Sequence, residues 1–598
     1  MQRILMLKYT LKNKKRKNYW RKKMHFKQET IKYLSEKLDL DVSLLEEIIE
    51  IPPQRDMGDL ALPCFRFAKE FRKSPMLIAQ DFNEKLKSVP EFIDKFLVLG
   101  PYLNVYFNQN IFIKDVVHSI LEAGDNYLMA GEGEGKNVVL DFSSPNIAKP
   151  FHVGHAFSTI LGDVIANFYK HRSYTVHRIN HLGDYGTQFG KLIVAYEKWG
   201  NPEELKENPI KELLRIYVKF HQEAELDESL IDVARTHFKN LENGNEYETK
   251  LWKSFREYSL EEFKKIYRRM DMKFDSYKGE AFYVDMLPQV IELLDSKNLL
   301  VESQGAQVVE LGEYDMPDMI IRKSDGSSIY ATRDIAAALY RHEQYNFDKL
   351  IYVVGLPQEL HFRQLFKILE LAGFSWSKNM EFVGFGLVKF PEGVKFSTRT
   401  GDVIYLEELL DESVNKVKEI IIANNQNREE KMSETEIGES AEIIGLAAVK
   451  YTYLRNSRER DIIFSWDEIL DFDGDTASYM LYSYARAKSI LRRAEFNETE
   501  ILQADLEVLD SDVEFELCIE LNNLETALLQ AMRNSEPSTF ARQIMNTCRS
   551  FSRFYNQQAI LQAESEELKL ARLALCEAFT QAIKVSLGLL GINTVERM

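Results

Sequence analysis

The 598-residue chain is longer than one hydrophobic core usually supports, so its length predicts about three domains. Its 45% apolar and 28% charged residues are typical of a water-soluble globular protein, and no stretch of 18 uncharged apolar residues predicts a membrane span. The net charge of -17 excludes a protein that covers nucleic acid with its whole surface, but it allows a local basic face. Four widely spaced cysteines without a Cys-x-x-Cys pair predict neither a zinc site nor a disulfide framework, and they fit a reducing cytoplasm.

Residues 1–24 form a basic tail that contains ten Lys or Arg and no acidic residue. They include too few apolar residues to build a core, so we expect this tail to be disordered. The tail lacks the long apolar stretch of a secretory signal. A true start at Met24 is an open alternative.

Residues 25–131 predict a small α+β domain. Residues 58–63 are expected to begin a second helical region, and residues 96–107 predict strands on either side of a Gly-Pro turn. The first helix is indicated by apolar residues at helical spacing, namely Ile31, Leu34 and Leu38.

A strand, a turn and a helix start come next. Residues 138–142 are a short apolar run typical of a buried parallel strand, Ser-Ser-Pro-Asn breaks it, and residues 156–169 have helical period. His152 and His155 therefore fall at a helix N-terminus, where free N–H groups and the positive end of the helix dipole favour an anion. Gly154 would let that anion approach the backbone. Two ordinary surface histidines are the alternative interpretation.

The strand, loop and helix pattern recurs immediately afterwards. Residues 175–179 predict a second strand, followed by the string Gly-Asp-Tyr-Gly-Thr-Gln at 183–188. This succession predicts a doubly wound, Rossmann-like sheet whose ligands gather at the carboxyl ends of its strands. Asp184 and Gln188 also fit a turn and a helix cap.

Residues 200–272 predict charged amphipathic helices inserted into the sheet, one of them beginning at a Ser259 capping box. Further on, Tyr330 and Asp334 are four residues apart, which places both on one face of a helix. A carboxylate beside a phenol suits a planar cation, because guanidinium offers forked donors. Spacing alone equally allows Asp334 to cap a helix or to pair with a neighbour.

Residues 441–598 consist mostly of helix formers and predict an α-bundle, which follows a polar, acidic linker at 424–440. Interleaved aromatic and basic side chains can stack on RNA bases and neutralise phosphates. A tyrosine stripe is also common in helical cores. The residues in question are Trp466, Tyr479, Tyr482 and Arg486.

The string Phe-Ser-Ser-Pro-Asn-Ile-Ala-Lys-Pro-Phe-His-Val-Gly-His at 142–155 resembles the nucleotide-binding signature of class I aminoacyl-tRNA synthetases, the arginyl-tRNA synthetases in particular. Tyr-Ala-Thr-Arg-Asp at 330–334 is similar to another segment of that family. The resemblance covers roughly residues 25–598. It implies a multidomain α/β protein with a small α+β tRNA-contacting domain at 25–131, a Rossmann-like class I synthetase catalytic domain at 132–423 with a helical insertion around 200–300, a linker at 424–440 and an all-α anticodon-binding bundle at 441–598.

The resemblance implies an arginine–tRNA ligase. Such an enzyme activates L-arginine with ATP to arginyl-adenylate and transfers it to the 3′ end of tRNA(Arg). It further implies Mg²⁺ with the ATP, no zinc, no protein metal site, no membrane, a monomer and a cytoplasmic location. Two rival interpretations are another adenylate-forming synthetase and a catalytically idle paralogue that only binds RNA or partners.

The resemblance also implies roles for individual residues. For L-arginine these are Asp141, Ser144, Asn146, His152, Tyr330, Asp334 and Gln358. For ATP they are His152, Gly154, His155, His361, Phe362, Lys395 and Ser397. For catalysis they are Lys149, His152, Gly154, His155 and Lys395. For tRNA they are Trp466, Tyr479, Tyr482, Arg486 and Met598.

Class I synthetases close over ATP with a lysine-rich loop, and two stretches compete for that role. Residues 431–435, Lys-Met-Ser-Glu-Thr, are the closer literal match, but a glutamate there would repel triphosphate. Residues 395–403 follow a predicted strand and resemble the degenerate loop of many arginyl-tRNA synthetases, so we favour them. Thr400 stands where some members have lysine. Lys149 is expected to take over that lysine's role.

Overall fold

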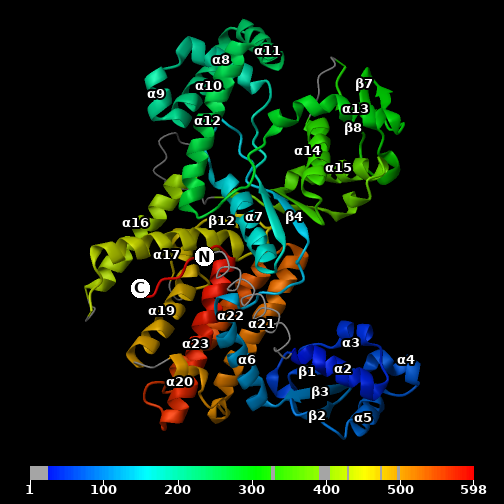
Figure 1. Ribbon diagram of the computed structural model, residues 1–598, viewed down its shortest axis with the longest axis vertical. Coiled ribbons are helices and arrows are strands. Elements are labelled where there is room, and N and C mark those ends of the chain that lie inside the picture. Colours follow the sequence, from blue (N-terminus) through cyan, green and yellow to red (C-terminus); the bar gives the residue numbers. More distant parts are fainter. Residues whose placement is uncertain (1–24, 325–329, 390–404, 427–429, 472–473, 495–497) are drawn as a thin grey trace, which may run out of the picture.

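The computed structural model describes residues 25–324, 330–389, 405–426, 430–471, 474–494 and 498–598. Figure 1 shows a small N-terminal unit beside a helical bundle, with a central parallel sheet and two insertions at the opposite end. The predicted basic tail at 1–24 and the predicted loop at 395–403 lie outside the described residues. No helix in the described ranges is long and apolar enough to cross a membrane.

The N-terminal unit contains an antiparallel sheet in the order β1-β3-β2. Strands β2 (Ile93–Leu99) and β3 (Tyr102–Phe107) flank the Gly-Pro turn, as predicted. The predicted apolar stripe of the first helix is buried, which confirms that helix. The helices of this unit are α2 (Phe26–Leu38), α3 (Val42–Ile48), α4 (Ala68–Phe71) and α5 (Pro75–Lys85).

The helical region expected from Gly58 is wrong at its start. Residues Leu60–Pro63 form strand β1, which pairs with β3. All four residues of β1 are buried, so the strand is apolar throughout. It lacks the alternation of apolar and polar residues by which a half-buried strand is recognised in sequence. Over four residues, such a run does not distinguish a strand from a helix.

The central sheet is parallel and has the strand order β10-β9-β4-β5, which confirms the predicted Rossmann-like arrangement. The chain runs from β4 through helix α7 to β5 on one side, and it later returns to β9 on the other side. The order therefore reverses beside β4, where ligands bind in such sheets. The bounds are β4 (Asn137–Asp141), α7 (Val153–His171), β5 (Thr175–Ile179), β9 (Lys349–Gly355) and β10 (Met380–Phe385).

Alternation along β4 assigns its side chains to two hydrophobic cores. Val138 and Leu140 pack into the larger core, which includes α7, whereas Val139 packs into a smaller core beneath the two helices that flank β9. Both faces of the sheet are therefore covered by helices. The helices that flank β9 are α14 (Tyr330–Tyr345) and α15 (Glu359–Leu371).

Two insertions interrupt the sheet. The first is helical, as predicted, but its last helix runs through Ser259 and does not begin there. The Ser259 hydroxyl instead accepts a hydrogen bond from the Ala148 N–H at 2.9 Å. Ser259 therefore serves a contact with a distant part of the chain, not a helix cap. The helices are α8 (Gln188–Trp199), α9 (Pro202–Glu207), α10 (Pro209–Leu226), α11 (Ser229–Glu242) and α12 (Glu246–Arg269). The second insertion holds α13 (Leu287–Ser296) and the antiparallel strands β6 (Val301–Ser303), β7 (Ala306–Val309) and β8 (Met319–Arg322).

The C-terminal region is a helical bundle, joined to the sheet region by a two-residue parallel pairing of β11 (Val388–Lys389) with β12 (Ile462–Ile463). Its helices are α17 (Glu434–Leu454), α18 (Trp466–Ile469), α19 (Ala477–Ala494), α20 (Glu498–Leu502), α21 (Asp512–Asn534), α22 (Pro537–Gln557) and α23 (Glu566–Leu589). Helix α16 (Leu406–Asn425) leads from the sheet to α17.

The linker predicted at 424–440 is wrong in its second half, because α17 begins at Glu434. Ser433 accepts a hydrogen bond from the Glu436 N–H, and the Glu436 carboxylate accepts one from the Ser433 N–H. The acidic residues that led us to predict a solvated linker instead lie in the first turn of a helix, where they stabilise its N-terminus.

A buried arginine joins the segment between α6 and β4, the sheet region and the bundle. Helix α6 (Gln109–Ala123) packs on α21 and α23 and leads into the segment before β4. Arg172, at the end of α7, lies 2.5 Å from Glu132 and 3.2 Å from Glu525, and it donates to the Leu128 carbonyl at 2.9 Å. The pairs tie the sheet to both of its neighbours.

Candidate active site

The turn after β4 has an unusual backbone. Three of its residues have positive φ angles, which residues other than glycine rarely adopt. The angles are 72° for Ser143, 43° for Ser144 and 61° for Ala148. Two hydrogen bonds hold the turn: the Ser143 N–H donates to Ser158 on α7, and the Ser158 hydroxyl donates to the Val353 carbonyl on β9. Such over-determined strain is common at functional sites.

A second loop packs against this turn. The Gly183 N–H donates to the Pro145 carbonyl at 3.1 Å, and the Ile147 N–H donates to the Gly183 carbonyl at 3.2 Å. A Cβ at Gly183 would lie 2.0 Å from Oδ1 of Asn146, so this glycine is required for the close approach. The exposed Asn146 is thereby presented at the carboxyl end of β4.

The two signature histidines stack at the start of α7, with ring centroids 3.8 Å apart. Nδ1 of His152 accepts from the Gly154 N–H at 3.0 Å, and Nδ1 of His155 accepts from the His152 N–H at 3.2 Å. Burial lowers the pKa of both imidazoles, that of His155 to about 3, and the charge of Lys149 lowers them further. Both rings are therefore neutral at pH 7, with their proton on Nε2 as a donor.

Gly154 and Lys149 complete this helix start. A Cβ at Gly154 would lie 2.9 Å from the His152 ring, so any side chain there would displace the histidine. Lys149 is exposed, and its charge acts on the pKa of both imidazoles. Neutral donors, free helix N–H groups and a flexible cation together suit a polyphosphate.

A group of acidic side chains lies near the carboxyl ends of β4 and β9, and it is called the acidic pocket below. Asp334 on α14 lies 2.6 Å from Nε2 of His361 on α15, which brings together a residue predicted for arginine and one predicted for ATP. Burial raises the pKa of the Asp334 carboxyl, but the hydrogen bond from His361 and the nearby His181 and Arg341 outweigh burial and lower it below its ordinary value. Asp334 is therefore ionised at neutral pH.

Other predicted pocket residues lie near it to different degrees. Tyr330, 60% exposed, begins α14 one turn before Asp334, and the exposed Gln358 directly precedes α15. Asp141 ends β4 and accepts a hydrogen bond from the Ser144 hydroxyl at 2.9 Å. Phe362, in contrast, is buried in the core against Tyr352 and Phe382, so its predicted contact with ATP finds no support in the described residues.

Asp184 proves structural. Its carboxylate accepts from Arg256 at 2.8 Å and from the Ala281 N–H at 3.0 Å, and it thereby anchors the first insertion. The structure thus favours the turn role over a role in ligand binding. The same contacts position Glu280, which no sequence pattern indicated.

Glu280 lies in a short 3-10 turn (Glu280–Met286), 3.4 Å from Arg333. One of its carboxylate oxygens is buried without a hydrogen-bond partner. Burial, partly offset by Arg333 and reinforced by Asp334 and Asp184, raises its pKa to about 7. No motif marks position 280, because only the tertiary fold brings it toward Asp334.

The two stretches predicted to compete as the lysine-rich loop differ in their position relative to the histidines. Lys395 and Ser397 lie outside the described residues. Tyr405 and Leu406, the first described residues after that stretch, lie beside the signature, since Tyr405 bridges to His152 and the Leu406 N–H donates to the Phe151 carbonyl at 2.9 Å. Met432, in the rival stretch, is buried next to Asn425 at the far end of α16, whose 20 residues span about 30 Å. Lys431 therefore lies too far away to meet a phosphate bound at His152.

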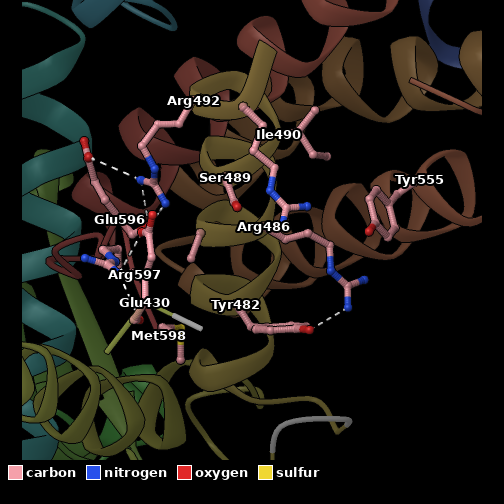
Figure 2. Close-up of a pocket in the computed structure, with 12 residues that line it drawn as sticks. Glu430, Tyr482, Arg486, Ser489, Ile490, Arg492, Tyr555, Glu596, Arg597 and Met598 are labelled. Atoms are coloured by element: carbon pink, nitrogen blue, oxygen red, sulfur yellow. Dashed lines mark hydrogen bonds and ion pairs between the residues drawn. The ribbon is translucent and has the colours of Figure 1, made fainter. Parts of the chain in front are cut away.

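A second candidate site is a pocket of about 670 Å³ on the bundle (Figure 2). It brings together three predicted tRNA-binding residues, Tyr482, Arg486 and Met598. The Arg486 guanidinium lies 4.5 Å from the centre of the Tyr482 ring and 4.8 Å from that of Tyr555. Additional arginines in the lining are Arg492, Arg493 and Arg597. Cationic side chains beside aromatic rings are suited to unstacked RNA bases.

The two remaining predicted tRNA-binding residues are not in that pocket. The Tyr479 hydroxyl lies 3.0 Å from the Ser552 hydroxyl on α22, an internal contact of the bundle. Trp466 packs edge-on against Phe464, and Lys416 lies 5.6 Å from its ring centre. Both contacts fit the alternative that aromatic side chains of this region belong to the bundle's packing.

Comparisons with known proteins agree with this geometry. Residues 116–466 match the family model described as tRNA synthetases class I (R), catalytic domain, so the sheet and its histidines define a class I synthetase. Residues 24–107 match the arginyl tRNA synthetase N terminal domain, and residues 480–598 match the DALR anticodon binding domain.

The arginine–tRNA ligase of Clostridium kluyveri is 49% identical over 575 residues, which are 96% of this chain and all of the relative. That of Clostridium perfringens is 50% identical with the same coverage. The chain belongs to the arginyl-tRNA synthetases, the class I enzymes that use ATP to charge tRNA with arginine.

Two solved structures share the fold. The Thermus thermophilus arginyl-tRNA synthetase has a TM-score of 0.79 at 22% identity, with 96% of this chain and 99% of that chain covered. The Plasmodium falciparum arginyl-tRNA synthetase has a TM-score of 0.78 at 24% identity, with 96% and 100% covered.

Proposed function

We propose how the residues of this arginine–tRNA ligase divide the reaction between them. The start of α7 holds the triphosphate, the acidic pocket between β4, α14 and α15 holds L-arginine, and the pocket on α19 holds the anticodon of tRNA(Arg). The observation that carries the proposal is that the two neutral histidines begin the helix after β4, whereas the ionised Asp334 contacts His361 on the helix after β9, the parallel neighbour of β4.

For ATP, we propose His152 and His155 as donors to the phosphates, Gly154 as the residue that keeps the His152 ring in place, and Lys149 as the mobile cation. The support is the neutral state of both rings and the electrostatic effect of Lys149 on them. We keep Lys395 and Ser397 as proposed ATP ligands on the resemblance of their segment alone. His361 joins the arginine side, because its ring contacts Asp334.

For L-arginine, we propose that Asp334 binds the guanidinium, with the Tyr330 ring beside it, while Glu280 stays paired with Arg333 and adds acidic character nearby. Asn146 and Gln358, both exposed at the carboxyl ends of β4 and β9, are suited to the substrate's amino and carboxylate groups. Asp141 and Ser144 form the floor of this pocket through their mutual hydrogen bond.

The chemistry needs positioning and charge stabilisation. A carboxylate oxygen of L-arginine attacks the α-phosphorus of ATP, a new P–O bond forms, and the bond to pyrophosphate breaks with its electron pair leaving on pyrophosphate. A ribose hydroxyl at the 3′ end of tRNA then attacks the arginyl carbonyl, loses its proton and releases AMP. The donors at α7 lie where negative charge grows on the phosphates during the first step.

We propose that Mg²⁺ accompanies ATP. Mg²⁺ is usually held by the phosphates of the nucleotide and by water, with few protein ligands. When bound, Mg²⁺ neutralises phosphate charge. The absence of zinc, a monomeric state and a cytoplasmic location remain part of the proposal, as do domain boundaries near residues 25 and 132, whereas the last boundary moves to the start of α17 at Glu434.

The test is ATP–pyrophosphate exchange with each of the 20 amino acids, with and without tRNA(Arg). We expect exchange to depend on L-arginine, and the arm with tRNA shows whether tRNA is needed for activation. Exchange with a different amino acid would contradict the arginine pocket. Tight tRNA binding without any exchange would instead support an idle RNA-binding paralogue.

A further inference from the structure

A guanidinium is already built into the acidic pocket. Arg341 lies seven residues after Asp334 on α14, so both side chains lie on one face of the helix. Its side chain is 1% exposed, and its Nη2 lies 2.7 Å from Oδ2 of Asp141 and 3.2 Å from Nδ1 of His181. Its guanidinium carbon lies 5.4 Å from the centre of the Tyr352 ring.

Both carboxylate oxygens of Asp141 have partners within the protein. One of its oxygens meets Arg341, and the other accepts the Ser144 hydroxyl at 2.9 Å. The charge of Asp141 is thus balanced by the protein itself, and the orientation of its carboxylate is fixed from two sides. Asp141 therefore offers a second guanidinium less net negative charge than an unpaired carboxylate would.

The other acidic groups around the pocket are balanced in the same way. Asp184 pairs with Arg256 at 2.8 Å, and Glu280 pairs with Arg333 at 3.4 Å. Among these acidic residues of the described pocket, Asp334 is the one whose partner is an imidazole, His361. An imidazole is a weaker competitor for a carboxylate than a guanidinium, because it lacks the forked pair of donors.

We propose that Arg341 is a positioning residue that sets substrate specificity: it neutralises Asp141, so the substrate guanidinium binds Asp334 and not Asp141. The inference rests on the proposed arginine pocket. Without Arg341, two carboxylates would compete for one guanidinium. A substrate held by Asp141 would bind in the wrong register, with its own carboxylate displaced from the α-phosphorus.

The resulting signature distinguishes kcat from KM. In Arg341→Gln, the added negative charge traps L-arginine unproductively, so we expect kcat of ATP–pyrophosphate exchange to fall about 10-fold or more without a rise in the KM for L-arginine. In Asp141→Asn, the uncompensated Arg341 repels the substrate guanidinium, so the KM for L-arginine should rise by a similar factor. A purely structural role would impair both variants in the same way.

The double variant Asp141→Asn/Arg341→Gln decides the inference, because it removes both charges together. We expect its kcat to exceed that of Arg341→Gln and its KM for L-arginine to lie below that of Asp141→Asn, with the KM for ATP unchanged. A double variant as impaired as the product of the two single effects would overturn the inference, as would an Arg341→Gln enzyme with unchanged constants. If Arg341→Gln does not fold, the double variant compared with Asp141→Asn alone gives the decision.

A parallel Asp334→Asn variant separates this inference from the proposed function. If Asp334→Asn leaves the KM for L-arginine unchanged, the proposed pocket itself fails. If Asp334→Asn raises that KM but the double variant shows no recovery, the pocket stands and only the role of Arg341 is overturned.

Discussion

At the scale of single residues, the state of the two signature histidines follows from their backbone contacts. Each Nδ1 accepts a backbone N–H, and burial lowers the pKa of each ring, so each neutral ring carries its proton on Nε2. The sequence predicted the position of these rings at a helix start. It could not predict their protonation, because protonation depends on burial and on the stacking of one ring on the other.

The charge of Asp334 is the basis of the first prediction. Asp334→Asn should raise the KM for L-arginine about 10- to 150-fold and leave the KM for ATP nearly unchanged, because hydrogen bonds to charged groups contribute roughly 1.5–3 kcal/mol. Steady-state exchange kinetics measure both constants. The control is Asp232→Asn, an exposed aspartate of α11 in a surface ion pair. An equal rise in both constants would refute the assignment.

The pKa of Glu280 gives a prediction for stability. The folded chain binds a proton at this carboxyl up to about pH 7, whereas the unfolded chain releases it near the ordinary value of 4.5. Stability therefore falls as the pH rises from about 4.5 to about 7, and the loss is complete above that range. Glu280→Gln avoids the loss, so the free energy of unfolding of the variant, relative to that of the parent, should increase between pH 5 and pH 8. We expect this increase to be about 2–4 kcal/mol.

Thermal or urea unfolding at the two pH values measures this difference. The exposed Glu313 supplies a matched control, since Glu313→Gln should show no such dependence. A pH-independent difference between Glu280→Gln and the parent would mean that the Glu280 carboxylate is ionised in the folded chain throughout this range.

At the scale of elements, the strand, turn and helix at β4 and α7 were predictable, because apolar runs and a Ser-Ser-Pro-Asn break mark them in sequence. The predictions were wrong where a residue or segment contacts a distant part of the chain. Ser259 accepts a backbone N–H from the signature turn, and β1 is a buried strand without alternation. Glu280 and Arg341 could not be found from sequence, because their partners come from other elements.

The two rival loops give a prediction at this scale. Lys149→Ala should lower the turnover of arginine-dependent exchange about 10²–10³-fold, the usual effect of losing one preorganised stabiliser of developing charge. Its melting temperature should hold, because Lys149 is exposed. Lys431→Ala is the matched control and should change almost nothing, since it lies at the far end of α16. Reversed effects would make residues 431–435 the signature loop.

At the scale of the whole molecule, the bundle that carries the α19 pocket packs against the sheet region (Figure 1), and the ion pair of Arg172 with Glu525 links the end of α7 to α21. The sequence predicted the order of the three regions. It did not predict how they contact one another, because each interface joins residues from distant parts of the chain.

Tyr482 gives the prediction for this scale. Tyr482→Ala should raise the KM for tRNA about 5- to 150-fold, because stacking on an aromatic ring contributes roughly 1–3 kcal/mol per base. The KM for L-arginine at saturating tRNA should not change. Tyr247→Ala, which removes an exposed tyrosine of α12, is the control. An unchanged KM for tRNA would mean that the anticodon does not enter this pocket.

The central claim is that ATP and L-arginine meet at the edge where β4, α7 and α14 converge. A crystal structure of the chain with a non-hydrolysable arginyl-adenylate analogue tests it most directly. We expect the guanidinium within hydrogen-bonding distance of Asp334, with His361 displaced or shared, and the phosphate analogue at the N–H groups and imidazoles that begin α7. An analogue whose guanidinium is held by Asp141, or whose phosphate lies away from His152 and His155, would contradict the account.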